Sequence, residues 1–276
     1  MTELAQLVAD PPGRTTPPIP AVELLSAEKV FANGVRGLSP IDLALYPGEF
    51  LSLIGPSGCG KSTLLKLIAN LSEPSDGRVQ WWRGGFERVG EPGRRLAFVF
   101  QDATLMPWAT VEANVRLPLS LAGVGRAEAK RRAAAALEQV ELGNAARRHP
   151  RQLSGGMRMR VSIARALVTE PDLLLMDEPF GALDEFTRNR LDEDLSRLAC
   201  ERHLTTVFVT HSIYEAVFLS TRILVMAANP GRLFSVFEID EPAPRSSAFR
   251  ESARFAGLCR ELSALLTEAS FASRAA

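Results

Sequence analysis

The sequence predicts an α/β fold with a mainly parallel β-sheet. Short, mainly apolar runs at 50–54, 96–100 and 173–176 have the length and composition of strands that are buried on both faces. Helical patterns without glycine or proline follow at 64–69 and 183–200. Buried strands separated by such helices are typical of a parallel sheet, because helices cover both of its faces. The 276 residues are enough for one large domain or two small ones.

The composition argues against several classes of protein. Lys and Arg total 32 and Asp and Glu total 32, so the net charge is zero, whereas binding to a nucleic-acid backbone normally requires a basic excess. We therefore expect no nucleic-acid partner. Cys59, Cys200 and Cys259 have no CxxC spacing, which indicates neither a disulfide framework nor a zinc site. No apolar run reaches the length of a membrane span and no secretory signal is visible, so we expect a cytoplasmic protein.

The chain divides into three parts by composition. Residues 1–22 are rich in proline and predict a flexible tail. Residues 23–240 contain the strands and helices of the main domain, and within it residues 102–165 are helical in pattern. We interpret that stretch as a helical subdomain inserted into the α/β core. Residues 241–276 have apolar positions at helical spacing, for which packing on the core is favoured over a partner or membrane surface.

The beginning of the main domain has a strand pattern of another kind. Segments at 28–31 and 41–45 alternate as half-buried strands and are followed by a turn at Pro47-Gly48, which together predict an antiparallel β arm. Thr110 is placed to cap a helix that begins at Val111. Further strands are predicted at 78–82, 205–210, 222–227 and 232–239, a loop at 83–95 and a helix at 126–141.

A glycine-rich loop lies between the first buried strand and the first helix. Residues 54–63 read Ile-Gly-Pro-Ser-Gly-Cys-Gly-Lys-Ser-Thr. The glycines permit a tight turn whose N–H groups surround an anion, and the helix N-terminus adds about half a positive charge there. Lys61 would reach the β- and γ-phosphates, and the Ser62 hydroxyl would coordinate Mg²⁺. A chance lysine in a glycine-rich turn is the alternative, but the flanking strand and helix favour a nucleotide-binding P-loop.

Two acidic residues end the strand at 173–176. Asp177 and Glu178 fall on the edge of the sheet where the carboxyl ends of parallel strands meet. Asp177 would then lie near Mg²⁺ and Ser62, while Glu178 would polarise an attacking water. A solvated cap on the strand is the alternative.

The residues Leu153-Ser154-Gly155-Gly156-Met157 indicate the N-terminus of a second helix that could face an anion. Two glycines precede an apolar-striped helix, and Ser154 is a candidate N-cap. One nucleotide does not need two such sites in one domain. We therefore expect the second site to serve a nucleotide that another subunit binds.

These motifs, in this order, resemble the ATP-binding subunit of an ABC transporter over residues 23–240. The resemblance implies Gln101 as the Q-loop residue, Ala182-Leu183-Asp184 as the D-loop and residues 153–157 as the signature. It further implies Glu178 as the catalytic base and His211 as the switch histidine. The implied ATP-binding residues are Phe31, which stacks on adenine, Gly55, Pro56, Ser57, Gly58, Cys59, Gly60, Lys61, Ser62, Thr63 and Gln101, and the implied metal ligands are Ser62, Gln101 and Asp177.

The family resemblance also implies partners and a mechanism. Two copies would sandwich two ATP molecules with Mg²⁺, each P-loop facing the partner's signature, on a separate pair of membrane-spanning permease subunits. Residues 105–111, 176–184 and 227–232 resemble the nitrate/sulfonate/taurine importer type. That subgroup implies an extracytoplasmic solute-binding protein and a place on the cytoplasmic face of the bacterial inner membrane.

Some readings stay open at this point. The apolar loop 105–108 fits either docking of the permease or packing within the helical subdomain. Met159 and Asn70 depart from the family's usual Gln and Gly, and Phe31 from its usual Tyr, without touching the chemistry. Uptake of another solute such as a vitamin precursor, a soluble ABC ATPase acting on nucleic acid, and a P-loop kinase or GTPase are the alternatives.

Overall fold

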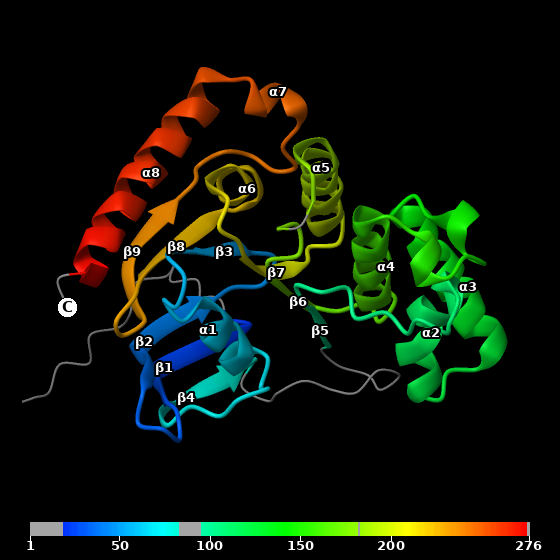
Figure 1. Cartoon of the computed structure of the whole chain (residues 1–276), viewed down its shortest axis with the longest axis horizontal. Helices are drawn as coiled ribbons and strands as arrows, with labels where there is room; N and C mark the ends of the chain where they lie inside the picture. The colour runs from blue at the N-terminus through cyan, green and yellow to red at the C-terminus, as the bar shows by residue number, and fades with distance from the viewer. Residues whose placement is uncertain (1–18, 83–94, 182, 275–276) are drawn as a thin grey trace, which may run out of the picture.

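The computed structural model describes residues 19–82, 95–181 and 183–274 (Figure 1). A six-stranded sheet forms its centre, in the order β5-β6-β7-β3-β8-β9. Neighbouring strands are parallel except for β9, which pairs antiparallel with β8. The mainly parallel sheet is therefore confirmed. The strands are β3 (Phe50–Ile54), β5 (Leu96–Val99), β6 (Leu173–Asp177), β7 (Thr205–Val209), β8 (Arg222–Ala227) and β9 (Arg232–Glu238).

A second, antiparallel sheet confirms the predicted arm. Its strands are β2 (Arg36–Leu45), β1 (Val22–Val30) and β4 (Asp76–Trp81), in that order. The prediction began β1 at residue 28, six residues too late. The reason is a bulge at Ser26, whose φ of 49° breaks the register and thereby the alternation of buried and exposed side chains.

The helices form two groups: one packs on the sheet, and the other forms a part of the molecule beside it. α1 (Lys61–Ile68) and α5 (Glu185–Glu201) belong to the α/β core, as does α6 (Ile213–Leu219), which was not predicted. α5 begins two residues later than predicted because Asp184 caps it by accepting a hydrogen bond of 2.9 Å from the Thr187 N–H. The helical pattern of the C-terminal part corresponds to α8 (Ala253–Arg274), which the short α7 (Ser247–Arg250) precedes.

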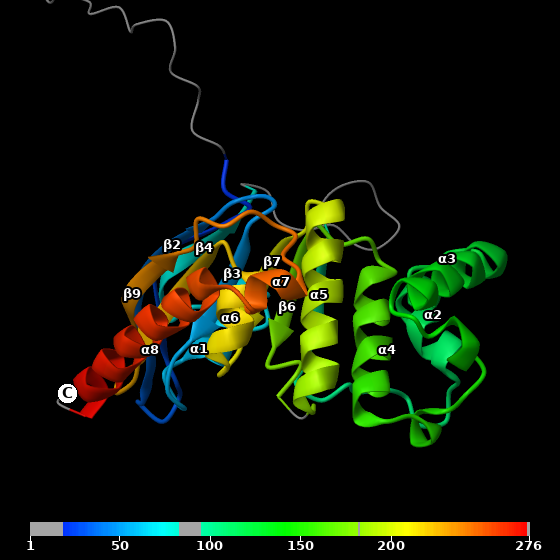
Figure 2. The same cartoon turned by 90° about the horizontal axis from the view of Figure 1, so that it is seen from above.

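The segment predicted as a helical subdomain holds three α-helices. α2 (Val111–Leu121) and α3 (Arg126–Gln139) lie away from the sheet, and α4 (Gly155–Leu167) stands between them and α5 (Figures 1 and 2). Two 3-10 turns, Gly143–Ala145 and Pro150–Gln152, join α3 to α4. The Thr110 cap is confirmed, since its hydroxyl accepts a hydrogen bond of 3.2 Å from the Ala113 N–H.

The C-terminal helix packs on the core, as expected from its spacing. α8 runs beside β8 and β9 (Figure 1), and Phe255, Leu258 and Leu262 are buried in the main apolar cluster. Among the residues that the structure describes, no helix has the length and apolar character needed to cross a bilayer. The predicted proline-rich tail lies outside the described residues up to position 18, as does the predicted loop from 83 to 94.

One buried amide holds the loop between β5 and α2. The Asn114 side chain is fully buried; its oxygen accepts a hydrogen bond of 2.7 Å from the Met106 N–H, and its nitrogen donates to three carbonyls of residues 106–110. Leu105 packs against the core, whereas Trp108 is 76% exposed. The amide therefore fixes a loop that presents an aromatic side chain outward.

Replacement of Asn114 by alanine should lower the free energy of unfolding by about 1–3 kcal/mol, because four partly buried backbone groups each lose a hydrogen bond. Denaturant titration measures this change. Asn144, which is exposed in the same subdomain, provides the matched control. An equal, small effect of Asn114→Ala and Asn144→Ala would contradict the assigned role of the buried amide.

Candidate functional site

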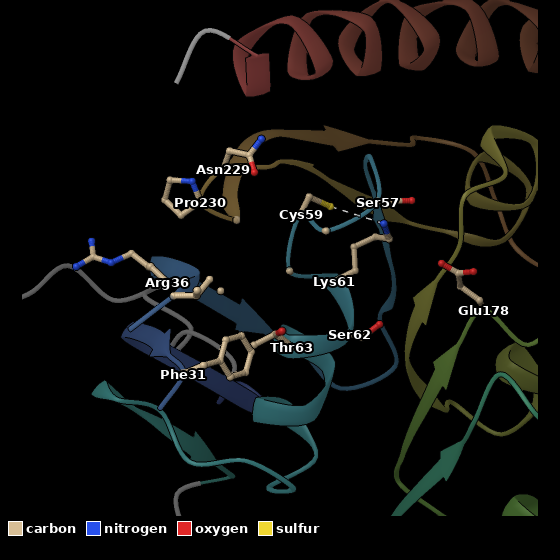
Figure 3. A pocket seen from close by; sticks show the side chains of 15 residues that line it. Phe31, Arg36, Ser57, Cys59, Lys61, Ser62, Thr63, Glu178, Asn229 and Pro230 are labelled. Atoms are coloured by element: carbon tan, nitrogen blue, oxygen red, sulfur yellow. Dashed lines mark hydrogen bonds between the residues drawn. The ribbon is translucent and has the colours of Figure 1, made fainter. Parts of the chain in front are cut away.

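A cleft of about 450 Å³ lies over the P-loop (Figure 3). Residues 57–63 form its floor, and Glu178, from the end of β6, forms part of its wall. Gly60 is the N-cap of α1 and has a φ of 89°, a conformation that glycine adopts without strain. The N-terminus of α1 therefore lies at the cleft, where its free N–H groups favour the binding of an anion.

The Lys61 side chain lies inside the loop. Its ammonium group donates to the Gly55 carbonyl at 2.8 Å and to the Pro56 carbonyl at 3.1 Å, and the residue is 8% exposed. The Cys59 thiol is 3.6 Å away, and burial raises the pKa of this thiol, with the positive charge of Lys61 acting in the opposite direction. The fully buried Cys59 side chain therefore fills space within the loop.

A hydroxyl that lines the cleft meets a carboxylate at the end of β6. Ser62 donates a hydrogen bond of 3.1 Å to Asp177 Oδ1. Burial raises the pKa of Asp177, and this hydrogen bond acts against the increase. A partly buried carboxylate beside a hydroxyl is a pair of oxygen donors of the kind that Mg²⁺ prefers, so the residues present fit the predicted ion.

Glu178 and His211 form a second pair at the same edge of the sheet. His211 Nδ1 lies 3.4 Å from Glu178 Oε2. Glu178 has a φ of 46°, in the left-handed region that side chains other than glycine rarely adopt. The hydrogen bond from its own N–H to the Val209 carbonyl, 2.9 Å long, holds this conformation. Such strained residues occur preferentially at functional sites, where the surrounding structure determines the backbone.

The other side of the cleft contains Phe31, which was predicted to stack on adenine, together with residues that were not predicted to line the site. Figure 3 shows Phe31, Arg36, Asn229 and Pro230 on one side of Lys61 and Glu178 on the other. Phe31 is 44% exposed and lines the cleft, so its ring is accessible to a base that binds there. The turn between β8 and β9 was recognised as a motif, but nothing in the local sequence indicates that it reaches the P-loop.

That turn approaches the P-loop so closely that a side chain does not fit. A Cβ on Gly231 would lie 2.5 Å from the Gly37 carbonyl oxygen and 2.6 Å from that of Cys59. The Ser39 N–H also donates to the Gly231 carbonyl at 2.7 Å. The antiparallel arm, the turn and the P-loop are therefore in direct contact through their backbones.

Other predicted site residues lie outside the cleft of this chain. Gln101 is exposed after β5, and Arg165 of α4 holds the following loop through the carbonyls of Ala103 and Thr104. The signature segment lies at the start of α4, where Ser154 accepts a hydrogen bond of 3.2 Å from the Met157 N–H. None of Gln101, His211 or the signature residues lines the cleft among the described residues.

The signature contacts the D-loop rather than the P-loop. A Cβ on Gly156 would lie 2.9 Å from Thr187 Cγ2 and 3.7 Å from Leu183 Cδ2, so the two segments are in close packing. Leu183 and Asp184 are described, whereas Ala182 lies outside the described residues. Capping of α5 lowers the pKa of Asp184, because the Thr187 N–H stabilises its charged form.

A P-loop that faces an acidic strand end on a parallel sheet defines a nucleoside-triphosphate-binding protein. The sequence model described as ABC transporter matches residues 38–181. The aliphatic sulfonates import ATP-binding protein SsuB of Bacillus licheniformis is 45% identical over 222 residues, 79% of this chain and 85% of that protein. The bicarbonate transport ATP-binding protein CmpC of Synechococcus elongatus is 47% identical over 216 residues, 77% of this chain and 32% of that protein.

A solved structure agrees with these relatives. A dimeric ATP-binding cassette in a post-hydrolysis state, bound to ADP and Pi, has a TM-score of 0.68 and 32% identity. It covers 80% of this chain and 100% of its own. This chain therefore belongs to the ABC transporter family, as an ATP-binding subunit that hydrolyses ATP.

Substitution of Gly231 by alanine should weaken ATP binding about tenfold or more. The added methyl group would overlap the carbonyl oxygens of Gly37 and Cys59 and displace the backbone of the P-loop, and overpacking of this kind costs about 1–3 kcal/mol. Titration with a fluorescent ATP analogue measures the effect. Gly257→Ala is the control, since a Cβ there meets nothing within 4 Å. Equal affinities in the two variants would show that the turn does not support the P-loop.

Proposed function

We propose that this chain powers the uptake of a small anion, of the sulfonate class, through separate membrane-spanning subunits. The observation that carries the catalytic part is the arrangement of two pairs, Ser62 with Asp177 and Glu178 with His211, each of which has one member, Ser62 or Glu178, in the lining of the P-loop cleft. The identity with the sulfonate importer subunit supports the solute class.

The residues of the cleft have distinct roles in the proposed reaction. Backbone N–H groups of residues 57–63 and the Lys61 ammonium bind the β- and γ-phosphates, and Phe31 stacks on the adenine. Ser62 and Asp177 would hold Mg²⁺, which neutralises phosphate oxygens when bound. Gln101 is proposed as a further ligand of that ion from the loop after β5.

Glu178 is the proposed catalytic base. Its carboxylate orients a water and accepts a proton from it as the water oxygen bonds to the γ-phosphorus. The bond from that phosphorus to the β,γ-bridging oxygen breaks, and ADP leaves with the electron pair. His211, 3.4 Å from the carboxylate, fixes Glu178 and donates a hydrogen bond toward the γ-phosphate.

The site is complete only in a dimer. Ser154 and Gly155 are exposed at the N-terminus of a 13-residue helix that does not line the cleft of its own chain. The N-terminus of a helix of this length favours an anion. Because it is exposed, it is available to a nucleotide that is bound by a second copy of the chain. The related cassette with ADP and Pi is dimeric, which supports the same assembly here, with residues 153–157 and the D-loop at the interface.

The remaining partners follow from the proposed importer role. Trp108 and the loop that Asn114 fixes would meet the permease, so the loop takes part both in packing and in docking. The permease places the chain on the cytoplasmic face of the inner membrane, and a solute-binding protein acts on the other side. Bicarbonate is the second candidate solute, because the CmpC relative is equally similar.

Glu178→Gln protein should form a stable dimer with ATP and Mg²⁺, because hydrolysis is blocked while every phosphate contact remains. Size-exclusion chromatography with and without ATP measures the association. Glu201→Gln, at the exposed opposite end of α5, is the control and should hydrolyse ATP and elute as a monomer. Protein with Glu178→Gln that stays monomeric at saturating ATP would rule out the proposed sandwich.

A deletion strain should fail to grow with taurine or an alkanesulfonate as the only sulfur source and should grow with sulfate. The reason is that uptake stops when the ATPase is absent. Complementation with the wild-type gene, but not with Lys61→Ala, should restore growth. Failure on nitrate or at low bicarbonate alone would move the assignment to that anion, and normal growth on every source would refute the proposed solute class.

A further inference from the structure

The C-terminal extension holds the helix that follows His211. Arg245 is 5% exposed, and its guanidinium donates hydrogen bonds of 2.9–3.0 Å to the carbonyls of Val217, Phe218 and Ser220, at the end of α6. These carbonyls have no partner within the helix, so an arginine is a favourable cap. The extension thereby fixes the C-terminal end of α6.

Arg250 of the same extension reaches a buried acid on α5. Its guanidinium donates a hydrogen bond of 2.7 Å to Asp192 Oδ2, and its central carbon lies 3.6 Å from the centre of the Phe218 ring. Asp192 is fully buried. The carboxylate on one side and the aromatic ring on the other together restrict the orientation of the Arg250 guanidinium.

A second buried acid, which lines the same cleft as Asp192 and Arg250, reaches the histidine loop. Glu215 of α6 is 3% exposed and accepts a hydrogen bond from the Thr210 hydroxyl. Thr210 in turn accepts a hydrogen bond of 2.9 Å from the Ser212 N–H, and Ser212 caps α6 by accepting one of 3.3 Å from the Glu215 N–H. Both chain neighbours of His211 are therefore tied to Glu215.

The same network reaches the D-loop. Arg188 lies 3.2 Å from Glu215 Oε1 and donates a hydrogen bond of 2.9 Å to the Leu183 carbonyl. Burial and the charge of Glu215 raise the pKa of Asp192 to about 7, and Arg250 and Arg188 act in the opposite direction. Without Arg250, a buried carboxylate would lose its partner beside a second acid, which favours rearrangement.

We propose that Arg250 is a positioning residue for His211, and that the C-terminal extension sets the rate of hydrolysis through Asp192, Glu215 and Thr210. The proposal rests on the proposed role of His211 in the reaction. A structural role alone would be expected to change only the stability of the fold. A positioning role changes the environment of His211 and the rate of the chemical step.

The test compares two arginine variants of the full-length chain. Arg250→Gln should lower kcat by roughly fivefold to twentyfold and leave the KM for ATP within about twofold, the range for residues within a coupling network. It should also shift the imidazole NMR signal of His211, one of only three histidines in the chain. Arg254→Gln, exposed on α8, is the matched control and should change neither. Arg250→Lys, which keeps the charge, should recover most of kcat.

Further variants separate the proposals. If Arg250→Gln does not fold, Asp192→Asn, which has the same shape without the charge, should shift the same signal. An unshifted His211 signal and an unchanged kcat in a folded Arg250→Gln or Asp192→Asn protein would overturn the inference. His211→Ala tests the underlying assignment: wild-type kcat in that variant would refute the catalytic role of His211, while a shifted His211 signal in Arg250→Gln would still support positioning.

Discussion

The common direction of five strands is the constraint on which the site depends. In a parallel sheet the carboxyl ends of neighbouring strands lie at one edge, about 4.8 Å apart. The register places Leu53 of β3 and Asp177 of β6 on either side of Val209 of β7. The P-loop, Glu178 and His211 follow the carboxyl ends of these strands, and Asp177 is the last residue of β6. The direction of the strands therefore places these groups together, independently of any contact between their side chains.

The parts of the site that the sequence predicted have local signals. The P-loop, the acids at the end of β6 and the two glycines before α4 each combine a few fixed residue types with a strand or helix next to them. The topology rule for parallel sheets then places the first two groups together. The pairs Ser62–Asp177 and Glu178–His211 agree with that expectation, although the catalytic and metal-binding roles themselves stay predictions.

The parts that the sequence did not predict depend on contacts between distant segments. Gly231 lies against Gly37 and Cys59, residues more than 170 positions earlier, and no local pattern records such an approach. α6 was missed because it has only seven residues and residues 215–219 are all buried, so it lacks the amphipathic period of a surface helix. A bulge at Ser26 similarly hid the first six residues of β1.

The charged groups behind His211 lead to a physical question about stability. Buried ion pairs contribute little to folding, because the cost of removing two charges from water is as large as their attraction, and apolar side chains of similar size are often as stable. Asp192 and Glu215 with their two arginines are therefore a poor choice if only stability matters. Directed hydrogen bonds provide something that apolar packing lacks, namely a fixed geometry between the elements that they join. Here those elements are the D-loop, the histidine loop and the C-terminal extension. Charged hydrogen bonds between these three elements therefore fix their relative positions at the site, even though apolar side chains in the same places could make the fold equally or more stable.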